Sequence, residues 1–86
     1  MKSSGCCEEA IASYQKSLEF LPDDAGVYYD IARCYALMVK VEWTVKMLQR
    51  AIDLDEQYRE NAKTDTDFDS LRDDPAFQAL LPDEGD

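Results

Sequence analysis

Two adjacent stretches within residues 23–56, each with apolar residues at helical spacing, constrain the fold of this chain most. In both stretches the apolar residues recur three or four positions apart, which places them on one face of an α-helix. The two sets are Tyr28, Ile31, Ala32 and Tyr35, then Val41, Val45, Leu48, Ala51 and Ile52. Asp23 and Asp24 precede the first helix and can accept hydrogen bonds from its free amide groups. Since no strand-like alternation occurs here, an all-α fold is predicted.

A further helix is predicted before this pair, from Glu8 to Leu21. Pro22 ends it, because the residue before a proline is pushed out of the helical region. The apolar stripe of this helix consists of Ala10, Ile11, Tyr14, Leu18 and Leu21. Residues 1–7 are expected to be a disordered or partial N-terminal segment.

Shorter helical segments are predicted in residues 57–81. They are a short helix over Tyr58–Lys63, an apolar pair formed by Phe68 and Leu71, and a helix that begins at Asp74-Pro75. Asp is a favoured cap, and Pro is tolerated at the first helical position because its missing N–H is not needed there. Residues 82–86 are expected to form a frayed tail.

A shift of 34 residues superposes the first helix on the last helix of the central pair, so that Ile11 falls on Val45 and Leu18 on Ile52. A helix–turn–helix unit with this period is typical of tetratricopeptide repeats, and residues 8–56 resemble that family. The matching positions are Ala10, Tyr14, Pro22, Tyr28, Ile31, Ala32, Tyr35, Leu48 and Ala51.

The resemblance implies about one and a half repeats. Residues 8–22 are the second helix of an incomplete repeat, and residues 23–56 are a complete one. Residues 57–81 resemble the segment that follows the last repeat in many bacterial members, which folds back as a C-terminal cap over the final helix. The residues that carry this second resemblance are Tyr58, Phe68, Leu71, Asp74, Pro75 and Phe77.

The chain departs from the family between the two central helices. Val39 stands where the family has a turn glycine, and residues 38–43 contain none of the residues that usually form turns. One continuous helix from Gly26 to about Leu54 is therefore an alternative to a hairpin. Thr44 stands where the family prefers alanine.

The charge and the cysteine content indicate which partners and which cellular compartment to expect. The net charge is −10, and residues 53–86 alone carry twelve acidic and three basic groups. Such a surface repels phosphate backbones, so no nucleic acid is expected as a partner. Cys6, Cys7 and Cys34 are expected to be reduced thiols of a cytoplasmic protein, since no signal peptide and no membrane span is recognisable.

No residues are placed for catalysis, and we expect neither an enzyme nor a cofactor. The chain has no histidine, which excludes Cys–His and Ser–His nucleophile pairs. Asp65-Thr66-Asp67-Phe68-Asp69 imitates the opening of a calcium loop. Ser70 replaces the required glycine, however, and Ala76 stands where the bidentate Glu belongs. We therefore favour a solvated turn, and no metal site is predicted.

The family resemblance implies a protein-interaction module that binds a peptide or a partner protein along its front helices. Here the complete front helix would present Tyr29, Arg33 and Leu37 to a peptide, and Arg33 could hold a carboxylate. The alternative is that Tyr29 and Arg33 are ordinary exposed residues.

A second predicted function is structural self-assembly. The first helix lacks the partner that a complete repeat would supply, so either the chain is a fragment of a longer protein or something else covers this helix. A homodimer or higher oligomer formed by exchange of helices would cover it. The expected interface consists of Ile11, Tyr14, Leu18, Trp43 and Met47. Alternatively, Trp43 fills the space left by the missing turn glycine.

Overall fold

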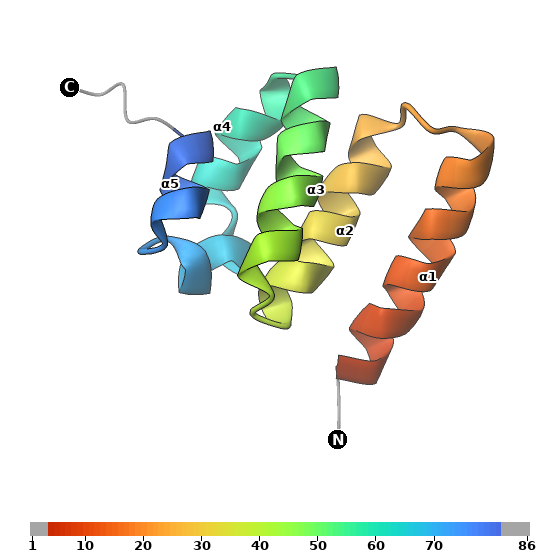
Figure 1. Ribbon diagram of the computed structural model, residues 1–86, viewed down its shortest axis with the longest axis horizontal. Coiled ribbons are helices and arrows are strands. Elements are labelled where there is room, and N and C mark those ends of the chain that lie inside the picture. Colours follow the sequence, from red (N-terminus) through yellow and green to blue (C-terminus); the bar gives the residue numbers. More distant parts are fainter. Residues whose placement is uncertain (1–3, 82–86) are drawn as a thin grey trace.

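The fold is all-α, as predicted (Figure 1). The computed structural model describes residues 4–81. In chain order the elements are α1 (Ser4–Phe20), α2 (Ala25–Leu37), α3 (Val41–Leu54), α4 (Gln57–Thr64), the 3₁₀ helix η1 (Thr66–Leu71) and α5 (Pro75–Leu80). In this part of the chain no helix has the length and apolar character needed to cross a membrane.

The N-terminal helix begins earlier than expected, at Ser4 instead of Glu8. The first three residues of the expected segment 1–7, and the expected tail 82–86, lie outside the described residues.

Helix α2 is the centre of the fold, with α1 on one side and α3 on the other (Figure 1). Ile31, Ala32 and Ala36 of α2 are fully buried. The two alanines let neighbouring elements approach closely, so that this helix is covered on more than one face. Asp24 caps α2 as expected, and its Oδ1 accepts a hydrogen bond from the Gly26 N–H at 3.1 Å.

The turn between α2 and α3 contains a left-handed residue, Val39, with φ 58°. Two hydrogen bonds of 2.9 Å close it, from the Lys40 N–H to the Tyr35 carbonyl and from the Val39 N–H to the Ala36 carbonyl. This pair of bonds is the Schellman motif, which usually has glycine at the left-handed position because a Cβ is strained there. The alternative of one continuous helix over residues 26–54 is therefore wrong.

Helix α3 buries one face against α2 and the segments that follow. Leu48 and Ala51 are fully buried, whereas Val45 is only partly so. Thr44, which stands where tetratricopeptide repeats prefer alanine, is also fully buried. Its hydroxyl donates to the Lys40 carbonyl at 2.8 Å, which satisfies the polar group without a partner on another helix.

The segments α4, η1 and α5 together form a cap over the hairpin. Helices α4 and α5 pack on α3, and η1 packs on α2. Asp74 caps α5 by accepting the Ala76 N–H at 2.9 Å, with Pro75 at the first helical position as expected. The large apolar side chains that the cap buries are Phe68, Leu71, Phe77 and Leu80.

Candidate functional site

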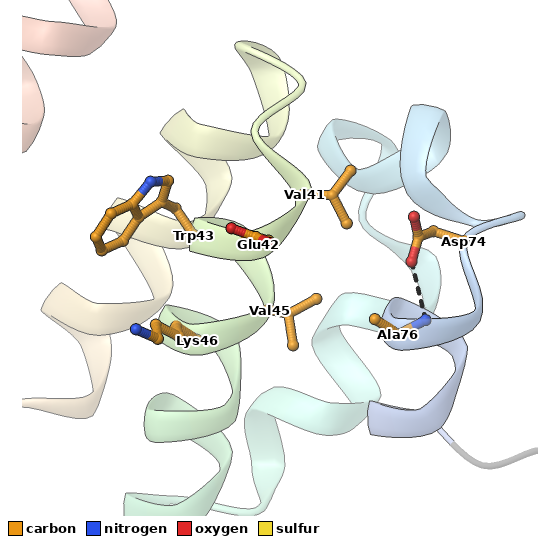
Figure 2. A pocket seen from close by; sticks show the side chains of 7 residues that line it. All are labelled: Val41, Glu42, Trp43, Val45, Lys46, Asp74 and Ala76. Atoms are coloured by element: carbon orange, nitrogen blue, oxygen red, sulfur yellow. Dashed lines mark hydrogen bonds between the residues drawn. The ribbon is translucent and has the colours of Figure 1, made fainter.

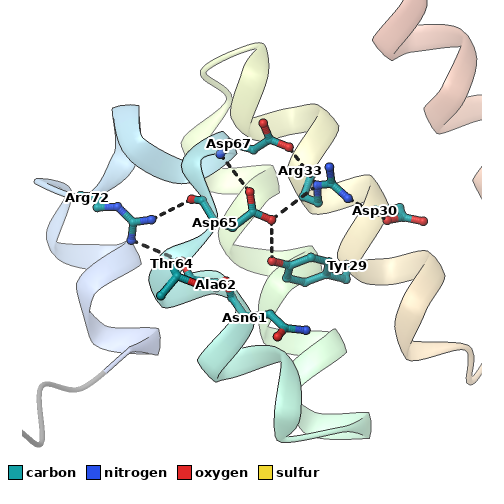
Figure 3. Close-up of polar contacts among 9 residues, drawn as sticks. All are labelled: Tyr29, Asp30, Arg33, Asn61, Ala62, Thr64, Asp65, Asp67 and Arg72. Carbon is teal, nitrogen blue, oxygen red and sulfur yellow. Dashed lines mark hydrogen bonds and ion pairs between the residues drawn. The ribbon is translucent and has the colours of Figure 1, made fainter.

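Tyr29, the first residue predicted to contact a peptide, is buried beneath the cap and only 6% exposed (Figure 3). Its ring centroid lies 4.8 Å from that of Tyr58 and 5.8 Å from that of Phe68. Its hydroxyl donates to Asp65 Oδ2 at 2.7 Å. Burial, reinforced by this hydrogen bond, raises the pKa of Tyr29. The expectation that Tyr29 faces solvent is wrong, because the cap covers it.

Arg33 follows one turn later on α2 and forms ion pairs with three carboxylates (Figure 3). Its Nε lies 2.9 Å from Asp67 Oδ2 and 3.6 Å from Asp65 Oδ2, and its Nη1 lies 3.5 Å from Asp30 Oδ1. The hydrogen bond to Asp67 is the main cause that raises the pKa of Arg33. The Arg33 guanidinium was expected to bind a carboxylate of a peptide. It binds carboxylates, but they belong to this chain.

The segment that meets Tyr29 and Arg33 is itself held in place. Asp65 Oδ1 accepts the Asp67 N–H at 3.0 Å, which shapes the start of η1. Arg72 donates to the Asp65 carbonyl at 2.7 Å and to the Ala62 carbonyl at 3.3 Å. We call the group of Tyr29, Arg33, Asp65 and Asp67 the latch, since it joins the cap to α2.

The latch gives the acidic run of residues 65–69 a role that sequence reasoning missed. Asp65 and Asp67 are engaged by Tyr29 and Arg33 instead of forming a purely solvated turn. Among the described residues, no group of three or more His, Cys, Asp or Glu could hold a metal ion. The available signal was the charge of this run, opposite to that of Arg33, but charge alone does not specify a partner.

Leu37, the third predicted peptide contact, is not part of the latch. It is 57% exposed at the end of α2, and Val39 in the turn is 61% exposed. Trp43, in the first turn of α3, is 48% exposed. Residues 37–43 therefore contain three large apolar side chains that are exposed to water.

An open groove of about 560 Å³ adjoins Trp43 on α3 (Figure 2). Val41 and Val45 point towards α5, whereas Trp43 and Lys46 lie on the opposite side of α3. The Trp43 ring stacks on Tyr35 with centroids 5.9 Å apart, and Lys46 Nζ lies 5.2 Å from its centroid. The residues that line the groove are Val41, Glu42, Trp43, Val45, Lys46, Asp74 and Ala76. Together with Leu37 and Val39 we call them the Trp43 surface.

The other residues predicted for an oligomer interface are less accessible. Ile11 is only 6% exposed, Tyr14 and Leu18 are half-buried, and Met47 packs partly against the core. Tyr14, expected on an uncovered face, lies beside α2, where the charge of Asp30 and partial burial raise its pKa. Helix α2 therefore covers much of the apolar face of α1.

Two apolar residues at the end of α1 are exposed instead. Phe20 is 81% and Leu21 61% exposed. Leu21 was expected in the buried stripe, but it lies beyond the last residue of α1, in the loop that leads to α2.

Comparison of the chain with family models, curated proteins and solved structures gave no match. The resemblance to tetratricopeptide repeats stays a prediction that depends on the residues named above.

Proposed function

We propose that this chain is a protein-interaction module, the end portion of a tetratricopeptide-type scaffold or assembly factor. The observation that carries the proposal is the exposure of Trp43 beside the open groove on α3, with Leu37 and Val39 exposed at the end of α2 and in the turn that follows. Exposing large apolar side chains to water costs free energy, and apolar patches surrounded by polar residues are typical of interaction sites. Aromatic and Met side chains are also enriched at interfaces.

In this proposal the partner binds the Trp43 surface and not the face of α2 that carries Tyr29 and Arg33. The acidic cap already occupies that face through the latch. A partner binding there would first have to displace the cap and expose the buried Phe68. The Trp43 surface needs no such rearrangement.

The chemistry of the surface defines the kind of partner. Trp43, Val41 and Val45 supply apolar contacts. Beside them, the two negative charges of Glu42 and Asp74 outweigh the one positive charge of Lys46. The net charge of the chain, −10, acts in the same direction. The fitting partner is a segment with one or two large apolar side chains flanked by Lys or Arg, because complementary charge speeds and orients binding.

Selection from a library of random peptides displayed on phage tests this function. The enriched peptides should carry apolar anchors with basic flanks, and the fluorescence of Trp43 should change when they are added. Trp43→Ala should weaken their binding by about 2 kcal/mol or more, the scale of an interface hot spot.

Phe20→Ala is the matched control, because Phe20 is an exposed aromatic residue at the end of α1. This variant should bind the selected peptides as the parent does, and thermal melts should show that both variants remain folded. Peptides that bind the parent and Trp43→Ala equally well would contradict the proposal.

We propose self-assembly by helix exchange as the second candidate function, and the conformation of Val39 favours it. A short hinge under strain promotes exchange between chains, because opening it relieves the strain. Light scattering at tens of micromolar tests this: a homodimer or larger species is expected, and Val39→Gly should shift it towards monomer. A parent that is purely the 9.8 kDa monomer would contradict it.

A further inference from the structure

Two cysteines on different helices lie at the same end of the α1–α2 contact. Ile11 of α1 and Ile31 of α2 are both buried. Cys7 lies four residues before Ile11, and Cys34 lies three residues after Ile31. Because the two helices are antiparallel neighbours (Figure 1), both steps lead one turn towards the same end of the pair.

The two thiols are also close enough to influence each other. Cys7 and Cys34 are free and partly buried, and Cys7 is near enough to Cys34 to contribute to the raised pKa of the Cys34 thiol. Disulfides form between residues whose Cβ atoms face each other across a short gap. Neighbouring positions on two packed helices can meet this condition without any change in the order of the helices.

We propose that Cys7 and Cys34 are a site of reversible oxidation, at which a peroxide forms a disulfide that joins α1 to α2. Hydrogen peroxide first oxidises the Cys7 thiol to a sulfenic acid: the sulfur attacks one peroxide oxygen, the O–O bond breaks, and the departing hydroxide takes the thiol proton and leaves as one water. The Cys34 sulfur then attacks the sulfenic sulfur, the S–S bond forms, the S–O bond breaks and a second water leaves. Two thiols and one peroxide thus give one disulfide and two waters.

The surroundings of Cys34 determine the order of these steps. Burial raises the pKa of Cys34 to about 11, so this residue remains a thiol at neutral pH and is a poor first nucleophile. Cys7 is therefore the sulfur that is oxidised first, and Cys34 is the one that resolves it.

Treatment of the full chain with dilute hydrogen peroxide tests the site. The Cys6→Ser variant leaves two thiols, and oxidation should remove both while the mass falls by about 2 Da as two hydrogens are lost. Tryptic cleavage after Lys16, Arg33 and Lys40 should release residues 34–40 joined to the N-terminal peptide. The midpoint of thermal unfolding should rise by roughly 5–10 °C, and dithiothreitol should reverse the change.

Cys34→Ser separates this site from other cysteine chemistry. This variant should form no disulfide within the chain, although Cys7 should still be oxidised to a sulfenic acid that dimedone traps. Disulfide-linked dimers of the Cys6→Ser variant, or a Cys34 that alkylates fully after peroxide treatment, would overturn the proposal. So would a bond between the neighbouring Cys6 and Cys7 in the parent chain.

Discussion

The two sides of α2 are held in different ways. Towards α3 and the cap, buried residues form one continuous cluster that includes Leu48, Phe68 and Phe77. Towards α1, Ile11 and Ile31 are buried outside that cluster, with half-buried residues around them. A helix that is covered on both sides is therefore not held equally firmly on both. Local opening begins where few apolar contacts join the two elements. We expect α1 to detach before the cap does.

The largest expected effect is on the cap side. Phe68 is fully buried against Tyr29 and Phe77, so Phe68→Ala should lower the free energy of unfolding by about 3–5 kcal/mol. Urea denaturation followed by circular dichroism would measure it. A loss below about 1 kcal/mol would mean that the cap is not part of the cooperative core.

A smaller loss is expected on the α1 side. Ile11→Ala should cost about 2 kcal/mol, the lower end for such a change, because half-buried neighbours let the site relax. Hydrogen exchange should speed up in α1 while the amides of α3 and the cap stay protected. Faster exchange throughout the chain would show that the two sides of α2 unfold together.

Val39→Gly should strengthen the α2–α3 hairpin. Glycine adopts the left-handed conformation without strain, and removing the strained side chain should stabilise the fold by about 1 kcal/mol after the entropic cost of glycine is deducted. The urea midpoint should rise with an unchanged slope. A destabilised variant would indicate that the exposed valine side chain makes contacts that outweigh the strain.

The last difference is absent at neutral pH and appears only as a difference in alkaline sensitivity. Cys34 faces α1 and Tyr29 faces the cap, and burial raises the pKa of both groups. Unfolding returns the pKa of each group towards its ordinary value, 9.0 for Cys34 and 10.0 for Tyr29. Above that pH the unfolded chain releases a proton that the folded chain keeps, so the stability falls as the pH rises.

The loss linked to Cys34 should therefore run from pH 9 to about 11, and that linked to Tyr29 should begin above pH 10. Cys34→Ala should remove the first and Tyr29→Phe the second, as read from melting midpoints against pH. Identical profiles for both variants and the parent would contradict this assignment.

Local signals in the sequence predicted much of this fold. Asp24 and the Asp74-Pro75 pair set where α2 and α5 begin, because capping depends on residues a few positions apart. The apolar spacing likewise predicted the burial of Leu48 and Ile31. Both properties depend on residues a few positions apart, so they can be predicted from the sequence alone.

The latch could not be predicted in the same way. Tyr29 and Asp65 are 36 residues apart. Helical periodicity indicates that a face of a helix is buried, but it does not indicate which segment covers that face. Tyr29 was assigned to an open groove for this reason. The Trp43 surface was predicted only in part: Leu37 and Trp43 were named for different reasons, and the sequence did not predict the groove between α3 and α5 beside Trp43.

The left-handed Val39 also bears on the speed of folding. This turn must close for α2 and α3 of the same chain to pack, and its strain is present only in states where it has closed. If the turn is closed in the folding transition state, Val39→Gly will accelerate folding and leave unfolding unchanged. If it closes later, the same substitution will slow unfolding alone. The folding and unfolding rates of this one variant would thus show when the hairpin forms, and both α1 and the cap pack on that hairpin.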